Sequence, residues 1–90
     1  MAKEAVILNV FGKVQGVGFR FYTQKKAGEL QISGFVKNMA DGSVYIEAEG
    51  ESSRLEEFIN WCEIGPPWAR VSKIDKQHIP PTNYTDFRVK

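Results

Sequence analysis

A short run near the N-terminus, Gly12-Lys13-Val14-Gln15-Gly16-Val17-Gly18-Phe19-Arg20, combines residue types that can bind phosphate. Glycine adopts backbone angles that strain other residues, so the chain can curl there with successive main-chain N–H groups pointing inward. If a helix begins near Phe19, its first N–H groups are unpaired and add partial positive charge. With the Arg20 guanidinium, such a curl is a candidate phosphate site. A glycine-rich turn with a surface arginine is the alternative, because short motifs often match by chance.

Composition and charge limit the kinds of partner that the chain can attract. Its 90 residues suit one domain, and 42% hydrophobic and 26% charged residues are ordinary for a globular protein. Twelve basic and eleven acidic residues give a formal net charge of +1. No broad field therefore attracts nucleic acid or an anionic membrane, and any anion site must be local.

The single cysteine and the absence of long apolar runs indicate a compartment. Cys62 is the only cysteine, which excludes an intrachain disulfide and a cysteine-based zinc site. The start of the chain does not resemble a signal peptide, and no stretch is long enough to span a membrane. We therefore expect a cytoplasmic protein.

Strand and helix patterns place the candidate phosphate loop between two regular elements. Residues 5–11 are apolar on both alternating faces apart from Asn9, which is typical of a central strand. Residues 19–30 follow a helical pattern with one apolar stripe. The loop of residues 12–18 thus follows a buried strand and leads into a helix.

The rest of the chain predicts one more helix and further strands. The expected strands are residues 33–38, 43–49, 69–78 with a bulge, and 86–90. The Asp41-Gly42 turn predicts a hairpin between the first two of these. The second helix is expected to begin with a capping box of Ser53 and Glu56 and to end before Gly65.

This β-α-β-β-α-β order predicts an α+β fold, the ferredoxin-like sandwich. Such a fold has an antiparallel sheet with two helices on one face, here with a short extra C-terminal strand. The first two strands are joined by a helical crossover, so they should run parallel and end at the same edge. The candidate phosphate loop and Asn38, which ends the second strand, should then meet at that edge.

Two motifs resemble those of the acylphosphatase family. Gly12-x-Val14-Gln15-Gly16-Val17-x-Phe19-Arg20 is similar to the first signature, and Gly34-Phe35-Val36-Lys37-Asn38-x-x-x-Gly42-x-Val44 is similar to the second. The helix around Phe58 and Trp61 also resembles the family, so the likeness covers nearly all of the chain. Two long motifs in the right order are more specific than either alone. The resemblance implies a single acylphosphatase-like domain over residues 1–90.

The resemblance also implies an activity and the residues that carry it. Acylphosphatases hydrolyse the carboxyl–phosphate bond of acyl phosphates to a carboxylate and inorganic phosphate. By matching positions, Arg20 and Asn38 would be catalytic, with Arg20 gripping the phosphoryl oxygens and Asn38 holding the attacking water. The phosphate-binding N–H groups would be those of Gln15, Gly16, Val17, Gly18, Phe19 and Arg20. We expect a small-molecule acyl phosphate substrate, an inorganic phosphate product, a monomer, and no cofactor, metal, nucleic acid or membrane partner.

The chemistry of the leaving group agrees with this substrate class. A carboxylate has a conjugate acid with a pKa near ~4 and leaves without protonation. A phosphate ester would expel a far more basic alkoxide, and a general acid would then help. No obvious acid stands beside either motif, which favours acyl phosphates. The group that accepts the proton of the attacking water stays open, and an oxygen of the substrate's own phosphate is one candidate.

No residue near the motifs offers a nucleophile, so direct attack by water is expected. Cysteine-dependent phosphatases carry a cysteine six positions before the phosphate-binding arginine, where this chain has Val14. We expect Cys62 to pack in the core. His78 should lie at a solvated strand end, and Trp61 and Trp68 should be packing residues.

Two positions depart from the family pattern. Gly18 stands where relatives often have an aromatic residue, which could loosen the loop or admit a larger acyl group. Gln31 stands where many relatives have a glycine that ends the helix. If Gln31 must adopt a left-handed conformation, it costs ~1 kcal/mol of stability.

Other interpretations remain open from the sequence. Asn38 could cap its own backbone at the turn, as asparagine commonly does. An RNA-binding module can have the same order of elements, but the strand of residues 44–49 has one aromatic residue and two glutamates. A non-catalytic phosphate-sensing domain, of the kind fused to larger carbamoyl-transferring enzymes, is the third possibility.

Overall fold

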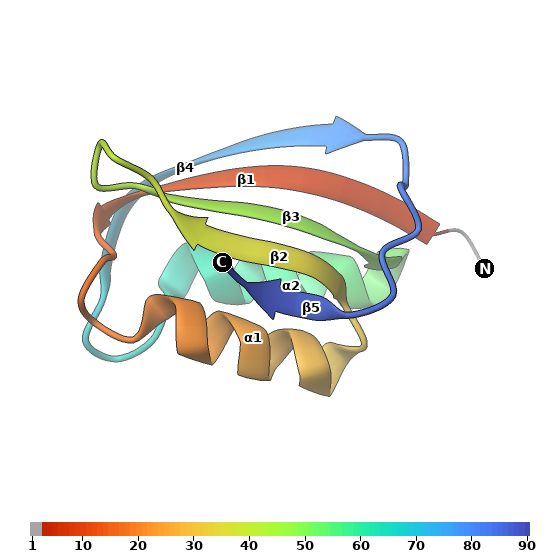
Figure 1. The fold of residues 1–90 in the computed structure, drawn as a ribbon, viewed down its shortest axis with the longest axis horizontal. Helices are drawn as coiled ribbons and strands as arrows, with labels where there is room; N and C mark the ends of the chain where they lie inside the picture. The colour runs from red at the N-terminus through yellow and green to blue at the C-terminus, as the bar shows by residue number, and fades with distance from the viewer. Residues whose placement is uncertain (1–2) are drawn as a thin grey trace.

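The computed structural model describes residues 3–90 and contains two helices and five strands within them. The expected order is confirmed (Figure 1). The elements are β1 (Lys3–Lys13), α1 (Phe19–Leu30), β2 (Ser33–Asn38), β3 (Val44–Glu51), α2 (Ser52–Ile64), β4 (Arg70–Ile79) and β5 (Phe87–Val89). Neither helix has the length and apolar character needed to cross a bilayer.

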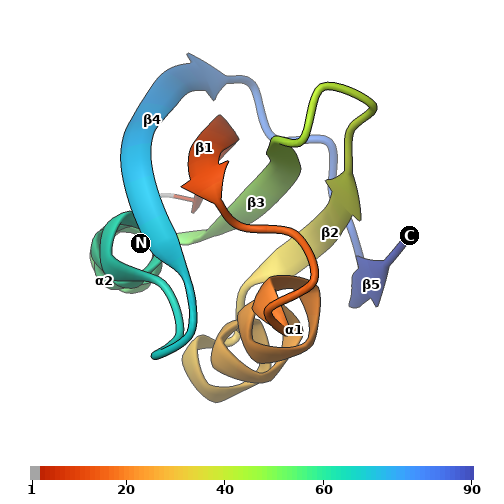
Figure 2. The ribbon, with the colours of Figure 1, turned by 90° about the vertical axis from the view of Figure 1, so that its left-hand side faces the viewer.

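The five strands form one sheet in the order β4-β1-β3-β2-β5, and both helices cover the same face (Figures 1 and 2). β1 pairs antiparallel with β3 and β4, and β2 pairs antiparallel with β3. The ferredoxin-like sandwich is therefore confirmed. The extra strand β5 joins β2 in parallel, so the five-stranded sheet is mixed.

The core lies between the sheet and the two helices. α1 buries the predicted stripe, and α2 buries a second stripe that includes Phe58 and Cys62. β1 contributes Val6, Leu8 and Val10, each fully buried. Because Cys62 lies inside this core, its predicted packing role is confirmed.

The two strands that should end together do so. β1 and β2 are both antiparallel to β3, so they run in the same direction. The loop that follows β1 and the last residue of β2, Asn38, therefore lie at the same edge, which faces the viewer in Figure 2. The edge predicted from connectivity is confirmed.

Several local details of the expected elements are corrected or confirmed. The capping box is wrong, because the N-cap of α2 is Glu51, two residues before Ser53, and Glu51 accepts a hydrogen bond from the Ser53 N–H at 3.0 Å. Trp68 is 71% exposed, so its expected packing role is also wrong. The bulge in β4 is confirmed by a register shift that leaves Ser72 without a partner on β1.

A buried carboxylate holds the segment that leads into β5. Glu49 is fully buried on β3 and accepts hydrogen bonds from the main-chain N–H groups of Thr82 and Tyr84, at 2.9 and 3.1 Å. Lys3 lies 3.3 Å from it. Burial alone would raise the pKa of Glu49, but the hydrogen bonds from Thr82 and the contact with Lys3 outweigh it and lower the pKa. The ionised carboxylate thus fastens residues 82–84 to the sheet.

Replacing Gln31 with glycine should stabilise the protein. Gln31 has φ 57° in the left-handed region at the end of α1, where a side chain is strained. We expect Gln31→Gly to raise the free energy of unfolding by about 1 kcal/mol. Urea denaturation measures this. Lys25→Gly, at an exposed position inside α1, should instead lower stability by about 1 kcal/mol. A loss of stability in Gln31→Gly would contradict the prediction.

Replacing Glu49 with glutamine should destabilise the fold in a pH-dependent way. The loss of charge and of matched acceptors should lower the free energy of unfolding at pH 7 by about 2–4 kcal/mol. Because the folded pKa is below the ordinary value of 4.5, the stabilisation is present above that pH and disappears as the pH falls through the folded pKa. The gap between wild type and Glu49→Gln, measured by urea denaturation, should therefore narrow in acid. Asp75→Asn, at an exposed ion pair, is the control and should change little.

Candidate phosphate-binding site

The loop between β1 and α1 is curled by two glycines. Gly16 has φ 73° and Gly18 has φ 77°, both in the left-handed region that glycine adopts without strain. Val14 anchors the start of the loop in the core, and Phe19 anchors its end. Buried side chains at both ends and glycines between them fix the shape of the loop.

The main-chain N–H groups of this loop have no protein acceptors. None of the N–H groups of residues 15–21 donates a hydrogen bond to an acceptor within residues 3–90. Gly18 is the N-cap of α1 and supplies no side chain to cap the helix. These donors, with the positive end of the helix dipole, form a cradle suited to an anion. We call residues 15–20 the cradle.

A small hollow brings the cradle together with Arg20 and Asn38. It has a volume of about 200 Å³. Its lining residues are Val14, Gly16, Gly18, Phe19, Arg20, Phe21, Asn38 and Val89. The structure therefore places both residues predicted to be catalytic at one hollow, with three of the other predicted cradle residues. Gln15 and Val17 do not line it.

Gln15 has a structural contact that the sequence did not predict. Its side-chain Nε2 donates to the main-chain oxygens of Met39 and Ser43, each at 2.8 Å. These two residues flank the turn between β2 and β3, directly after Asn38. Gln15 thus ties the cradle to the strand end that carries Asn38. The sequence held no signal for this contact, because it joins residues 24 and 28 positions apart.

The side chain of Asn38 is free to bind a ligand. Its Oδ1 is buried and has no hydrogen-bond partner within residues 3–90. The turn is instead stabilised by Asp41, whose Oδ1 accepts a hydrogen bond from the Ser43 N–H at 2.9 Å. Asn38 Oδ1 therefore does not cap the turn, and an acceptor without a donor faces a site where water or substrate can supply one.

Arg20 is held beside the hollow by the end of the chain after β5. Its Nη1 donates to the main-chain oxygen of Lys90 at 2.9 Å. No aspartate or glutamate of residues 3–90 lies within ion-pair distance of its guanidinium. Arg20 is thus held by the main-chain oxygen of Lys90 and not by an acidic side chain.

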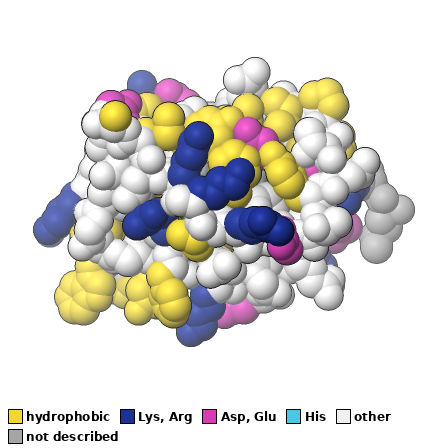
Figure 3. Space-filling model, viewed as in Figure 1, with side chains coloured by type: hydrophobic (Ala, Val, Ile, Leu, Met, Phe, Trp, Pro, Cys, Tyr) yellow, Lys and Arg dark blue, Asp and Glu magenta, His cyan; other side chains and the backbone are white. Residues whose placement is uncertain are grey.

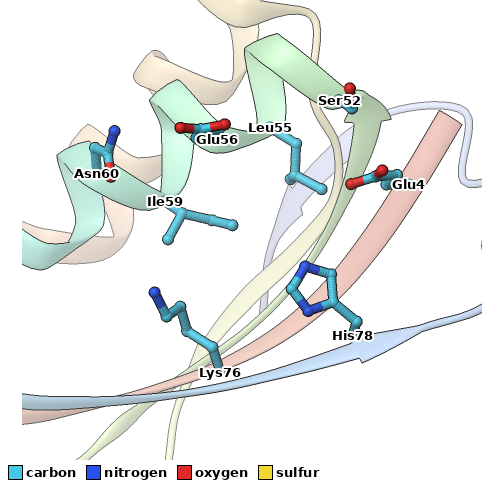
Figure 4. Close-up of a pocket in the computed structure, with 8 residues that line it drawn as sticks. All are labelled: Glu4, Ser52, Leu55, Glu56, Ile59, Asn60, Lys76 and His78. Carbon is cyan, nitrogen blue, oxygen red and sulfur yellow. The ribbon is translucent and has the colours of Figure 1, made fainter. Parts of the chain in front are cut away.

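A larger hollow of about 400 Å³ lies away from the cradle, between α2 and strands β1 and β4 (Figure 4). Lys76 and His78 extend from β4 toward Leu55 and Ile59 of α2, and Glu4 lies beside them. The residues that line this hollow include both acidic and basic side chains but none of the predicted site residues. His78 is exposed near the end of β4, as expected.

Among residues 3–90, neither a reactive thiol nor a cluster of metal ligands lies at the hollow. Burial raises the pKa of the Cys62 thiol, so this cysteine stays protonated in the core, away from the cradle. Within residues 3–90, no three His, Cys, Asp or Glu side chains are arranged to hold a metal ion. The polar groups at the hollow are main-chain N–H groups, the guanidinium of Arg20 and the carboxamide of Asn38.

Comparison with known proteins identifies the family of this site. The acylphosphatase family model matches residues 6–89. An acylphosphatase of Mannheimia succiniciproducens is 54% identical over 67 residues, which cover 74% of each chain. The structure of an acylphosphatase from Coxiella burnetii is similar with a TM-score of 0.94 and 42% identity, covering 98% of this chain and 93% of that chain.

A similar domain also occurs within a much larger protein. The structure of full-length HypF in its phosphate- and nucleotide-bound form is 30% identical, with a TM-score of 0.88. The match covers 99% of this chain but 12% of that one. The matches to the family model and to these two structures extend along nearly the whole described chain. The protein is therefore a member of the acylphosphatase family.

Proposed function

We propose that the protein hydrolyses acyl phosphates at the cradle, releasing a carboxylate and inorganic phosphate. The observation that carries this proposal is one small hollow lined by Arg20, Asn38 and the loop with unpaired N–H groups. The loop and Arg20 suit the binding of the phosphoryl group, and Asn38 suits the positioning of water. The names of the relatives support the same reaction class.

In this proposal the cradle and Arg20 hold the phosphoryl group. Phosphoryl transfer demands mainly positioning and stabilisation of charge on the equatorial oxygens. The N–H groups of residues 15–20 are preorganised donors, because no protein acceptor competes for them. Arg20 adds a permanent positive charge and can donate two parallel hydrogen bonds to a phosphate.

Asn38 positions the attacking water. Its unpaired Oδ1 accepts a hydrogen bond from the water, and this orients an oxygen lone pair toward phosphorus. As the new P–O bond forms, the bond to the carboxyl oxygen breaks, and the carboxylate leaves with the bonding electron pair. The proton of the water passes to an oxygen of the phosphoryl group, so no protein base is needed.

We propose that the reaction needs no metal and no general acid. The leaving carboxylate is the weak base of an acid with a pKa of about 4, so it departs unprotonated. The cradle and Arg20 supply the positive charge that a metal supplies at many other phosphoryl-transfer sites.

The similarity to a segment of HypF raises a second candidate function. In it, the chain is a phosphate-binding domain that works within a larger assembly and has no turnover of its own. We propose instead that residues 1–90 act as one acylphosphatase-like domain and as a monomer in the cytoplasm. The presence of both Arg20 and Asn38 at the hollow supports turnover. Phosphate binding alone requires the cradle and gives Asn38 Oδ1 no task.

The activity is tested with benzoyl phosphate in the presence of EDTA. We expect loss of the substrate with release of equal amounts of benzoate and inorganic phosphate, at a rate that EDTA does not change. Inorganic phosphate should inhibit competitively, because it occupies the cradle. Binding of phosphate without hydrolysis of benzoyl phosphate would favour the non-catalytic candidate.

Variants of Arg20 and Asn38 should separate binding from turnover. Arg20→Gln should weaken phosphate binding and lower kcat/KM by about 10²–10³, because it removes a charged donor from the phosphoryl oxygens. Asn38→Ala should lower kcat by a similar factor and leave the affinity for inorganic phosphate nearly intact. Steady-state kinetics and phosphate titration measure the two effects.

Matched substitutions away from the hollow serve as controls for these variants. Arg88→Gln removes an exposed arginine that pairs with Asp86, and Asn60→Ala changes an exposed asparagine on α2. Both controls should retain activity and phosphate affinity. An equal loss of phosphate affinity in Arg20→Gln and Asn38→Ala would contradict the assigned roles.

A further inference from the structure

The parallel pairing of β5 with β2 brings two lysines together beside the cradle. Val36 pairs with Val89, and the Lys90 N–H donates to the Val36 oxygen at 2.8 Å. The next residues on each strand path are Lys37 and Lys90. Both lysines therefore reach the sheet face that the helices leave uncovered. Figure 3 shows Lys and Arg side chains gathered in the middle of the molecule, over β2 and β5.

Both ammonium groups contact the same aromatic ring. Lys90 Nζ lies 4.1 Å from the centroid of the Phe35 ring, and Lys37 Nζ lies 5.9 Å from it. Lys37 Nζ also lies 5.4 Å from the centroid of Tyr45, which stacks on Phe35. Cation–π attraction orients both lysine side chains toward Phe35.

Neither lysine forms an ion pair with an aspartate or glutamate of residues 3–90. Glu47 pairs with Phe35 across the strands, and its two oxygens accept hydrogen bonds from the hydroxyls of Tyr45 and Tyr84, at 2.7 and 2.6 Å. Two ammonium groups that no aspartate or glutamate contacts attract an anion from solution.

The two lysines are chain neighbours of residues that line the hollow, but their side chains lie on the other face of the sheet. Lys37 directly precedes Asn38, and Lys90 directly follows Val89, and both of those neighbours line the hollow. The main-chain oxygen of Lys90 accepts the hydrogen bond from Arg20. On its other side Lys90 lines an open hollow of about 330 Å³, together with Phe35 and Tyr84. Because successive residues of a strand point to opposite faces of the sheet, a ligand that reaches the two ammonium groups must extend from the cradle around Val89 to the other face.

We propose that Lys37 and Lys90 form a second anion subsite, which binds a carboxylate or phosphate on the acyl portion of the substrate. This inference rests on the proposed function and narrows it to acyl phosphates that carry a distal negative charge. The phosphoryl group occupies the cradle, and the distal anion lies between the two ammonium groups over Phe35. Acyl phosphates without a distal charge bind through the cradle alone.

Binding of stable phosphonates tests the subsite without requiring turnover. The probes are phosphonoacetate, 3-phosphonopropionate and 4-phosphonobutyrate, each compared with the alkylphosphonate in which a methyl group replaces the carboxylate. At low salt, we expect at least one carboxylated probe to bind about fivefold or more tightly than its uncharged partner. Titration calorimetry measures both affinities, and high salt should reduce the ratio.

Single substitutions then assign the preference to the two lysines. Lys37→Met and Lys90→Met should each remove most of the preference for the carboxylated probe, while the affinity for the matched alkylphosphonate stays nearly unchanged. Lys73→Met is the matched control, because Lys73 Nζ also lies over an aromatic ring, 5.2 Å from the Phe11 centroid, but on β4. It should keep the preference.

The outcomes separate this inference from the proposed function. Equal affinity of every carboxylated probe and its alkyl partner would overturn the second subsite and leave the cradle standing. An equal loss of preference in Lys73→Met would show a general charge effect and would also overturn the subsite. Failure of all the phosphonates and of inorganic phosphate to bind would overturn the cradle and the subsite together.

Discussion

The site depends on a group of main-chain N–H donors that the fold leaves without acceptors. Such donors are normally paired, so a loop that exposes several of them must be held in shape by other contacts. Here Val14 and Phe19 anchor the two ends in the core, and the Gln15 side chain bonds the loop to the β2–β3 turn. The same Gln15 contact fixes the distance between the loop and Asn38. The shape of the loop and its position relative to Asn38 thus depend on one shared contact.

The short strand β5 links the site to the rest of the sheet. It pairs with β2, and the segment before it is fastened to β3 through the buried Glu49. Because Lys90 accepts the hydrogen bond from Arg20, this chain of contacts extends from the sheet face to the guanidinium. The three-residue strand β5 therefore helps to position the guanidinium of Arg20, which is the charged group of the cradle.

Local patterns predicted most of the fold and placed Arg20 and Asn38 correctly in space. The α1 bounds, the β2–β3 hairpin, the bulge in β4 and the shared edge of β1 and β2 all followed from short-range periodicity and connectivity. The contacts that the sequence did not predict join distant residues, such as Gln15 with Ser43 and Arg20 with Lys90. The predicted cap of α2 is wrong because β3 ends at Glu51 and the helix begins at the next residue. Glu51 and not Ser53 therefore occupies the N-cap position.

The groups at the hollow restrict the chemistry that it can support. The hollow offers main-chain amides, a guanidinium and a carboxamide. None of these groups donates or accepts a proton reversibly near neutral pH. Cys62, the one thiol, is protonated and lies in the core. In the proposed reaction the site acts by holding charge and orienting water, and this requires a leaving group that departs without a proton. A carboxylate meets that requirement, whereas the alkoxide of a phosphate ester does not.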